Sequence, residues 1–293
     1  MKTNFLFFRI KRKIFSKILK NKIAKDILKQ DMTYNYLYKK FNKIIINSNY
    51  YEINDKINKT IWVCWLQGIE QAPELVKVCY NKLKKSSKGY KVVLITSKNF
   101  KDYVNIPEFI ISKWKKGIIS NTHFSDILRI ELLAQNGGIW IDSTVFVTMD
   151  KVPKYLEENP LFVFKEVNLN RIDEPLISAS NWFMKANSNH PIILLTRDLL
   201  IEYWSKTDIL IDYFVFHLFF TMARKKYSNL WNDIPVYNNI NPHILQFELL
   251  SEYKTDRFEY YKKVSDFHKL SYKLKIEKKA YTSNLDYIMM GDK

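Results

Sequence analysis

Residues 125–144 read SDILRIELLAQNGGIWIDST, and this segment decides the fold because it predicts a helix, a turn and a strand in direct succession. Ser125 is the expected N-cap, since a serine hydroxyl can accept a hydrogen bond from a free backbone N–H of the first helical turn. Leu128 and Leu132 recur at helical spacing, and Gly137 suits the positive φ angle of a helix C-cap. We therefore expect a helix that ends at the glycines.

Three charged side chains lie around this turn. The apolar run Ile-Trp-Ile predicts a buried strand, and Asp142 follows it at the carboxyl end, where open α/β sheets bind their ligands. Asp126 and Arg129 are three residues apart and share one helix face. This set suits a ligand with hydroxyl and phosphate groups, or a metal. Separately, Asp126 and Arg129 could form a surface ion pair and Asp142 could cap a turn; their occurrence together favours a binding site.

The chain beyond residue 55 alternates strands and helices. Strands are predicted at 60–66, 91–96, 161–164 and 177–186, and helices at 73–84, 107–116, 190–204 and 211–225. This order predicts an α/β fold with a parallel sheet and crossover helices. The sequence contains no internal repeat, so one main domain is expected.

The combination of Ser-Asp-x-x-Arg with Gly-Gly-x-Trp-x-Asp resembles the sugar-nucleotide site of glycosyltransferase family 32 and of the related bacterial capsular polysaccharide synthesis proteins. The resemblance extends, in the expected order, to residues 61–68, 72–76, 180–183 and 268–273. It implies a GT-A (Rossmann-like) nucleotide-diphospho-sugar transferase fold for residues 56–293. Residues 1–55 would then form a basic, amphipathic helical extension.

The resemblance also implies roles for individual residues. The catalytic residues would be Asp126, Arg129 and Asp142. Of these, Asp126 and Arg129 would bind sugar hydroxyls or phosphate. The donor nucleotide sugar would further contact Trp65, Gln67, Gly68, Gly138 and Lys269. The substrate side would include Asn181, Trp182 and Asp212. Alternatively, Trp65 and Trp182 could be core aromatics, and Asp212 could be an acid at a helix start.

A divalent metal is a further implication of the resemblance. Asp142 would be the first acid of an Asp-x-Asp motif, and Mn²⁺ or Mg²⁺ suits its oxygen ligands. The third position is Thr144, a neutral and poorer ligand than aspartate, and a late histidine, His268, would complete the metal shell. The other histidines lack metal-ligand spacing and are predicted to be structural or solvated: His123, His190, His217 and His243.

The formal charge of +17 is concentrated near the N-terminus, where residues 1–29 contain ten lysines or arginines and one acid, Asp26. Apolar residues recur here at about every fourth position, which predicts an amphipathic helix: Leu6, Ile10, Ile14, Ile18, Leu19, Ile23 and Ile27. Such a helix suits an anionic membrane surface. The alternative is a helix packed on the catalytic domain with its lysines in water. Nucleic acid is not an expected partner, since no module that reads it is recognisable.

The expected location is the cytoplasm, peripheral at the inner face of the plasma membrane. Cys64 and Cys79 are expected to be buried free thiols, which favours a reducing compartment. No apolar run approaches the roughly 20 residues that span a bilayer. A secretory signal is not expected, because charges interrupt the N-terminal apolar residues and no small-residue cleavage site follows.

The resemblance implies a hexosyltransferase that moves a sugar from a nucleotide-diphosphate sugar to a capsular or surface polysaccharide precursor. By resemblance, the acceptor is lipid-linked or an oligosaccharide, and transfer retains the anomeric configuration through front-side attack. Two alternatives stay open. Thr144 also fits a catalytically inactive scaffold of a polysaccharide assembly complex, and the charge alone fits a nucleic-acid-binding protein.

Overall fold

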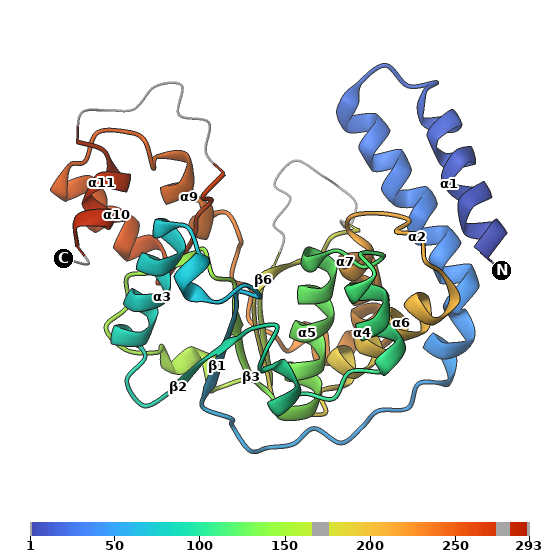
Figure 1. The fold of residues 1–293 in the computed structure, drawn as a ribbon, viewed down its shortest axis with the longest axis horizontal. Coiled ribbons are helices and arrows are strands. Elements are labelled where there is room, and N and C mark those ends of the chain that lie inside the picture. Colours follow the sequence, from blue (N-terminus) through green and yellow to red (C-terminus); the bar gives the residue numbers. More distant parts are fainter. Residues whose placement is uncertain (1, 166–175, 274–281, 292–293) are drawn as a thin grey trace.

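The computed structural model describes residues 2–165, 176–273 and 282–291. Its centre is a five-stranded sheet in the order β2-β1-β3-β6-β5 (Figure 1). The strands are β1 (Thr60–Cys64), β2 (Lys91–Ile95), β3 (Gly138–Ile141), β5 (Leu161–Lys165) and β6 (Ala179–Ala186). The predicted strands are therefore confirmed within two residues at each end.

The directions of the strands differ from the prediction of a parallel sheet. β1 runs parallel to β2 and to β3, whereas β6 runs antiparallel to both β3 and β5. Apolar runs identify buried strands but carry no information on direction, because side chains alternate between the two faces whichever way a neighbouring strand runs. The fold is thus a mixed α/β fold in which β3 joins a parallel half to an antiparallel half.

Different elements cover the two faces of the sheet (Figure 1). One face packs against α4 (Glu108–Lys115), α5 (Asn121–Asn136), α6 (Pro191–Lys206) and α7 (Val215–Lys226). The other packs against α3 (Glu74–Ser86) and a two-stranded antiparallel sheet of β4 (Val145–Val147) and β7 (Phe267–Lys269). The remaining helices are α8 (Ser228–Asn232), α9 (Asn241–Phe247), α10 (Thr255–Val264) and α11 (Asn284–Met290), of which the last three lie on the α3 side.

The decisive helix, α5, begins one turn earlier than predicted. Ser120, and not Ser125, is its N-cap, because the Ser120 hydroxyl accepts the backbone N–H of His123. The two serines are equivalent caps by residue type; the earlier start allows Phe124 to be fully buried. The C-cap prediction is confirmed, since Gly137 has a φ angle of 70°.

The N-terminal extension is a helical hairpin rather than one helix. α1 (Lys2–Ser16) packs on α2 (Lys22–Asn47), and α2 contacts α6 and α7 (Figure 1). Phe5, Leu37 and Phe41 anchor the hairpin in the main core, whereas most of the predicted apolar stripe is exposed. Within the described part of the chain, no helix combines the length and apolar character needed to cross a bilayer.

Candidate active site

A cavity of about 500 Å³ lies at the carboxyl ends of β1 and β3. Its walls come from the first half of α5, the residues that follow β1 and β3, strand β6, the start of α7 and the end of β7. The predicted site residues that line it are Trp65, Gln67, Asp126, Arg129, Asp142, Asn181, Trp182 and Lys269. Folding therefore brings residues more than a hundred positions apart into one cavity.

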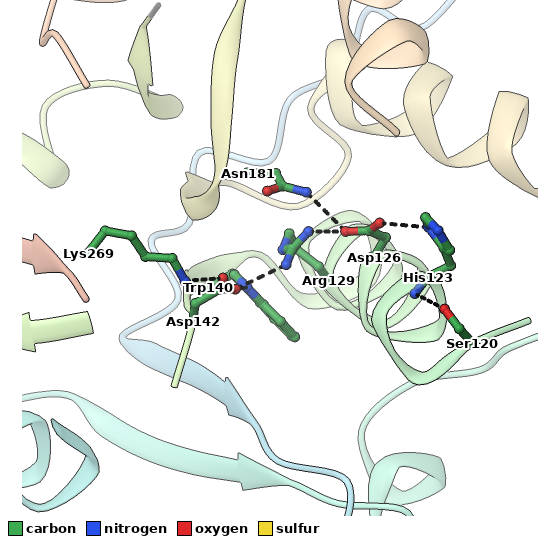
Figure 2. A network of polar contacts seen from close by, with 8 residues as sticks. All are labelled: Ser120, His123, Asp126, Arg129, Trp140, Asp142, Asn181 and Lys269. Atoms are coloured by element: carbon green, nitrogen blue, oxygen red, sulfur yellow. Dashed lines mark hydrogen bonds and ion pairs between the residues drawn. The ribbon is translucent and has the colours of Figure 1, made fainter. Parts of the chain in front are cut away.

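Arg129 joins the two carboxylates of this cavity (Figure 2). Its Nη1 donates to Asp126 Oδ1 at 2.5 Å, and its Nη2 donates to Asp142 Oδ1 at 3.1 Å. The guanidinium lies over the Trp140 ring, 4.8 Å from the ring centroid, and only 4% of Arg129 is exposed. Because a planar guanidinium donates in fixed directions, Arg129 sets the spacing of the two carboxylates.

Lys269 reaches Asp142 from the side opposite Arg129 (Figure 2). Its Nζ donates to Asp142 Oδ2 at 2.8 Å and to Thr144 Oγ1 at 2.8 Å. Lys269 ends β7, whose pairing with β4 places it opposite Val145, next in sequence to Thr144. The register of this small sheet thus delivers the lysine to the end of the central strand.

Both carboxylate oxygens of Asp142 accept hydrogen bonds. Trp140 Nε1 donates to Oδ1 at 2.9 Å, beside the bond from Arg129, and Lys269 donates to Oδ2. Burial alone would raise the pKa of Asp142, but the charges of Lys269 and Arg129 and these hydrogen bonds outweigh it and lower the pKa. Asp142 is therefore a carboxylate at neutral pH.

Two further side chains lie next to Asp126, and one of them donates a hydrogen bond to it. Asn181 Nδ2, on β6, donates to Asp126 Oδ1 at 3.0 Å, and His123 Nδ1 lies 3.5 Å from Asp126 Oδ2 (Figure 2). The antiparallel half of the sheet therefore contributes directly to the site through Asn181.

Two tryptophans of the cavity differ in their surroundings. The Trp65 ring is half-buried and meets Tyr272 edge to face, with ring centroids 5.8 Å apart. Trp182 is 5% exposed and stacks on Phe164 at 4.9 Å, inside the apolar core. Trp65 is therefore more available to a ligand, whereas Trp182 lines the cavity and also belongs to the core.

Two predicted ligand-binding glycines do not line the cavity. Gly68 has a φ angle of 90° and precedes a short 3-10 turn. Gly138 has a φ angle of 101°, and a Cβ atom there would lie 2.6 Å from the carbonyl oxygen of Thr60 on β1. The positive φ angle therefore favours glycine at both positions. At Gly138 the close approach of β3 to β1 also leaves no room for a side chain.

His268 and Asp212 also lie away from the positions expected of them. His268 is wholly buried, with its Nε2 3.2 Å from Thr148 Oγ1, and burial lowers its pKa to about 4. Successive strand residues point to opposite faces, so with Lys269 directed at Asp142 its neighbour His268 is directed away. Asp212 forms an ion pair with Arg12 of α1 instead of lining the cavity.

Tyr213 and His217 were not predicted as site residues, but both line the cavity, Tyr213 just before α7 and His217 in its first turn. Burial is the main reason that the pKa of His217 falls to about 4, so the imidazole is neutral at neutral pH. Its Nδ1 is buried without a hydrogen-bond partner among the described residues. The available signal was the four-residue spacing from Tyr213 to His217, but a histidine without metal-ligand spacing favoured a structural interpretation.

The donor set does not fit the metal that the Asp-x-Asp resemblance implies. In the described ranges, no group of three or more His, Cys, Asp or Glu side chains could hold a metal ion. The oxygens of Asp142 and Thr144 that would face such an ion accept hydrogen bonds from the Lys269 ammonium. Mn²⁺ and Mg²⁺ need several such oxygens as ligands.

The fold and the cavity define the class: an α/β protein with a cavity lined by charged side chains at the carboxyl ends of its parallel strands. The chain belongs to the capsular polysaccharide synthesis protein family, whose model matches residues 11–288. Among solved structures, it is similar to a PaToxG glycosyltransferase, with 18% identity and a TM-score of 0.41 over 69% of this chain and 83% of that one. It is also similar to a transferase mutant, with 15% identity and a TM-score of 0.32 over 62% of this chain and 76% of that one. No curated protein matches this sequence.

Proposed function

We propose that this chain is a glycosyltransferase that moves a sugar from a nucleotide-diphosphate sugar to a capsular or surface polysaccharide precursor. The observation that carries the proposal is the convergence of Asp126, Arg129, Asp142 and Lys269 in one cavity of a chain from this family. Carboxylates can accept hydrogen bonds from sugar hydroxyls, and an ammonium can bind a diphosphate. The cavity volume of about 500 Å³ also falls within the usual range for small-molecule sites.

The lining residues divide between the parts of such a donor. Trp65 offers a partly exposed ring on which a base can stack, and Gln67 offers an exposed amide beside it. Asp126 faces the cavity as an acceptor for sugar hydroxyls, while Lys269 provides positive charge for the diphosphate. We therefore propose that the nucleotide binds at the carboxyl ends of β1 and β3, as in a GT-A arrangement.

Retention of the anomeric configuration by front-side attack is part of the proposal. A double displacement needs a carboxylate that is free to attack the anomeric carbon. Among the described lining residues, Asp126 and Asp142 are the carboxylates, and Arg129 holds both. In front-side attack, the carbon–oxygen bond to the diphosphate breaks with its electron pair on that oxygen. The acceptor hydroxyl oxygen bonds to the anomeric carbon and passes its proton to the departing phosphate.

A lipid-linked acceptor is supported by the surface of the N-terminal hairpin. Of the twenty large hydrophobic side chains exposed in the described parts of the chain, ten lie on the hairpin, and eight of these fall within residues 6–27: Leu6, Phe7, Ile10, Ile14, Phe15, Ile18, Ile23 and Ile27. Exposed basic residues, including Lys13 and Lys17, accompany them. Apolar side chains can enter the interfacial region of a bilayer while lysines bind anionic headgroups. If the hairpin only packed on the domain with its lysines in water, its exposed isoleucines would have no function.

Release of nucleoside diphosphate from a panel of nucleotide sugars tests the transferase. We expect one donor to turn over, and Asp142→Asn to lower the rate by about 100-fold, because the carboxylate that positions the Lys269 ammonium and the Arg129 guanidinium is lost. Asp102→Asn, at an exposed position outside the cavity, is the control and should retain the wild-type rate. Failure of every donor to bind or react, with and without Mn²⁺ or Mg²⁺, would favour the inactive scaffold.

Vesicle flotation tests the membrane contact. We expect the full chain to float with vesicles containing phosphatidylglycerol and to stay in solution with pure phosphatidylcholine. Ile14→Asp combined with Ile18→Asp should abolish flotation. Ile46→Asp should not, because this similarly exposed isoleucine lies at the C-terminal end of α2, outside residues 6–27. Equal flotation of both variants, or none by the wild type, would remove the membrane from the proposal.

A further inference from the structure

The Lys269 ammonium lies between the two side chains that an Asp-x-Asp motif would use to hold a cation. Its Nζ is 2.8 Å from Asp142 Oδ2 and 2.8 Å from Thr144 Oγ1. These are the first and third positions of the motif. The lysine therefore occupies the place of a metal ion with respect to these two oxygens.

Among the residues that the structure describes, the remaining ligands for a metal ion are lacking as well. Asp142 Oδ1 accepts hydrogen bonds from Arg129 and Trp140, so both oxygens of this carboxylate are engaged. His268, the residue expected to complete a metal shell, is buried against Thr148. A divalent cation at this point would have to displace the ammonium and would lie near the second positive charge of Arg129.

The four charged side chains of the site sum to zero, because Arg129 and Lys269 offset Asp126 and Asp142, so a further acid at position 144 would make the site net negative. Asp142 carries one negative charge and is paired with both Arg129 and Lys269. Thr144 is neutral, so it holds the ammonium without cancelling its charge. An aspartate at position 144 would add a negative charge and form a second ion pair with Lys269, so the positive charge of the lysine would no longer be available to a ligand. The substitution that weakens a metal site therefore strengthens a lysine site.

Lys269 also has a hydrogen available for a ligand. An ammonium has three N–H donors, and the described residues accept two of them, at Asp142 and Thr144. Lys269 lines the cavity, and its side chain is 22% exposed. The third N–H can therefore be directed at a bound phosphate oxygen without breaking the two existing hydrogen bonds.

We propose that Lys269 is the resident cation of this site, and that the chain binds its donor diphosphate and transfers the sugar without a divalent metal ion. This inference rests on the proposed glycosyltransferase function. As the anomeric carbon–oxygen bond breaks, the electron pair goes to the diphosphate oxygen, and the Lys269 ammonium stabilises the charge that develops there. The proton of the acceptor hydroxyl still ends on the departing diphosphate.

Calorimetric titration of UDP, GDP and dTDP into the full chain, in EDTA and again in Mn²⁺, tests the inference without turnover. We expect one nucleoside diphosphate to bind with the same Kd in both solutions, within about threefold. Binding that appears only with Mn²⁺, or tightens more than about tenfold, would overturn the resident cation and keep the transferase. No binding in either solution would overturn the proposed function and the inference with it.

Variants of Lys269 separate its charge from a structural role. Lys269→Ala should weaken binding of that nucleoside diphosphate at least about tenfold in EDTA, and Lys269→Arg should recover part of the loss. Lys273→Ala, which removes an exposed lysine outside the cavity, is the matched control and should leave Kd unchanged. Unchanged binding in a folded Lys269→Ala variant would overturn the inference.

Direct binding of Mn²⁺, followed by the loss of its free-ion electron paramagnetic resonance signal, gives a readout independent of any nucleotide. We expect no binding by the wild type and detectable binding by the double variant Thr144→Asp with Lys269→Ala, which supplies two carboxylates and removes the ammonium. Stoichiometric binding of Mn²⁺ by the wild type would overturn the inference, whether or not the double variant folds.

Discussion

Arg12 of α1 forms an ion pair with Asp212, the residue directly before Tyr213 at the wall of the cavity. The distance between Arg12 Nη1 and Asp212 Oδ2 is 2.5 Å, and Arg12 Nη2 also donates to the backbone oxygen of Ile211 at 2.7 Å. The two side chains are 13% and 12% exposed. This contact ties the N-terminal hairpin to the loop that carries Tyr213.

Asp212→Asn should destabilise the protein by about 2 kcal/mol, because it leaves the largely buried charge of Arg12 without its counterion. Asparagine keeps the side-chain oxygen that accepts the backbone N–H of Phe214, so the loop itself is preserved. Urea unfolding measures the change. Asp26→Asn, which removes a more exposed ion pair with Lys29, should cost under about 1 kcal/mol; equal losses for the two variants would contradict the prediction.

Arg129→Lys should cost about 3 kcal/mol of folding free energy and abolish nucleotide binding. A lysine has one nitrogen and cannot bridge the carboxylates of Asp126 and Asp142, which then lie close together without a shared counterion. Urea unfolding and calorimetry measure the two effects. Arg9→Lys, at an exposed position of α1, is the control. A stable Arg129→Lys variant that binds nucleotide as the wild type does would show that the bridge is dispensable.

His268 should make stability depend on pH below neutrality. Its folded pKa of about 4 lies below the usual value of 6.5, so the unfolded state takes up the proton first as the pH falls. The wild type should lose about 3 kcal/mol from this group between pH 6.5 and 4, and nothing from it above pH 6.5. His268→Gln should remove this part of the slope in urea unfolding at a series of pH values. An identical slope in the variant would mean that His268 titrates alike in both states.

The two tryptophans should separate ligand binding from stability. Trp65→Ala should weaken nucleotide binding by about tenfold, as loss of a stacked base typically does, with a small change in stability. Trp182→Ala should cost about 3–5 kcal/mol, because it removes a ring stacked on Phe164 in the core. Calorimetry measures nucleotide binding and urea unfolding measures stability for both variants. If Trp182→Ala weakened binding and Trp65→Ala lowered stability instead, Trp182 would be the ligand-binding ring and Trp65 the core residue.

The sequence by itself was sufficient for the helix, turn and strand that present Asp126, Arg129 and Asp142. A three-residue helical spacing, a glycine that tolerates a positive φ angle and a short apolar strand are properties of neighbouring residues. Their geometry changes little with context. These local features also carry the resemblance to capsular polysaccharide synthesis proteins, and the family match confirms that part of the resemblance.

The tertiary structure decided the relations between distant segments. Strand periodicity is the same for parallel and antiparallel neighbours, so the direction of β6, which brings Asn181 to Asp126, was not encoded locally. Whether His268 or Lys269 meets Asp142 depends on one residue of register between β4 and β7. Asp212 forms its ion pair with Arg12, which is two hundred residues away in the sequence. Strand direction, strand register and ion pairing between distant residues depend on packing and charge compensation over the whole fold. These contributions to the folding free energy arise only when distant segments come into contact, so local sequence patterns do not contain them.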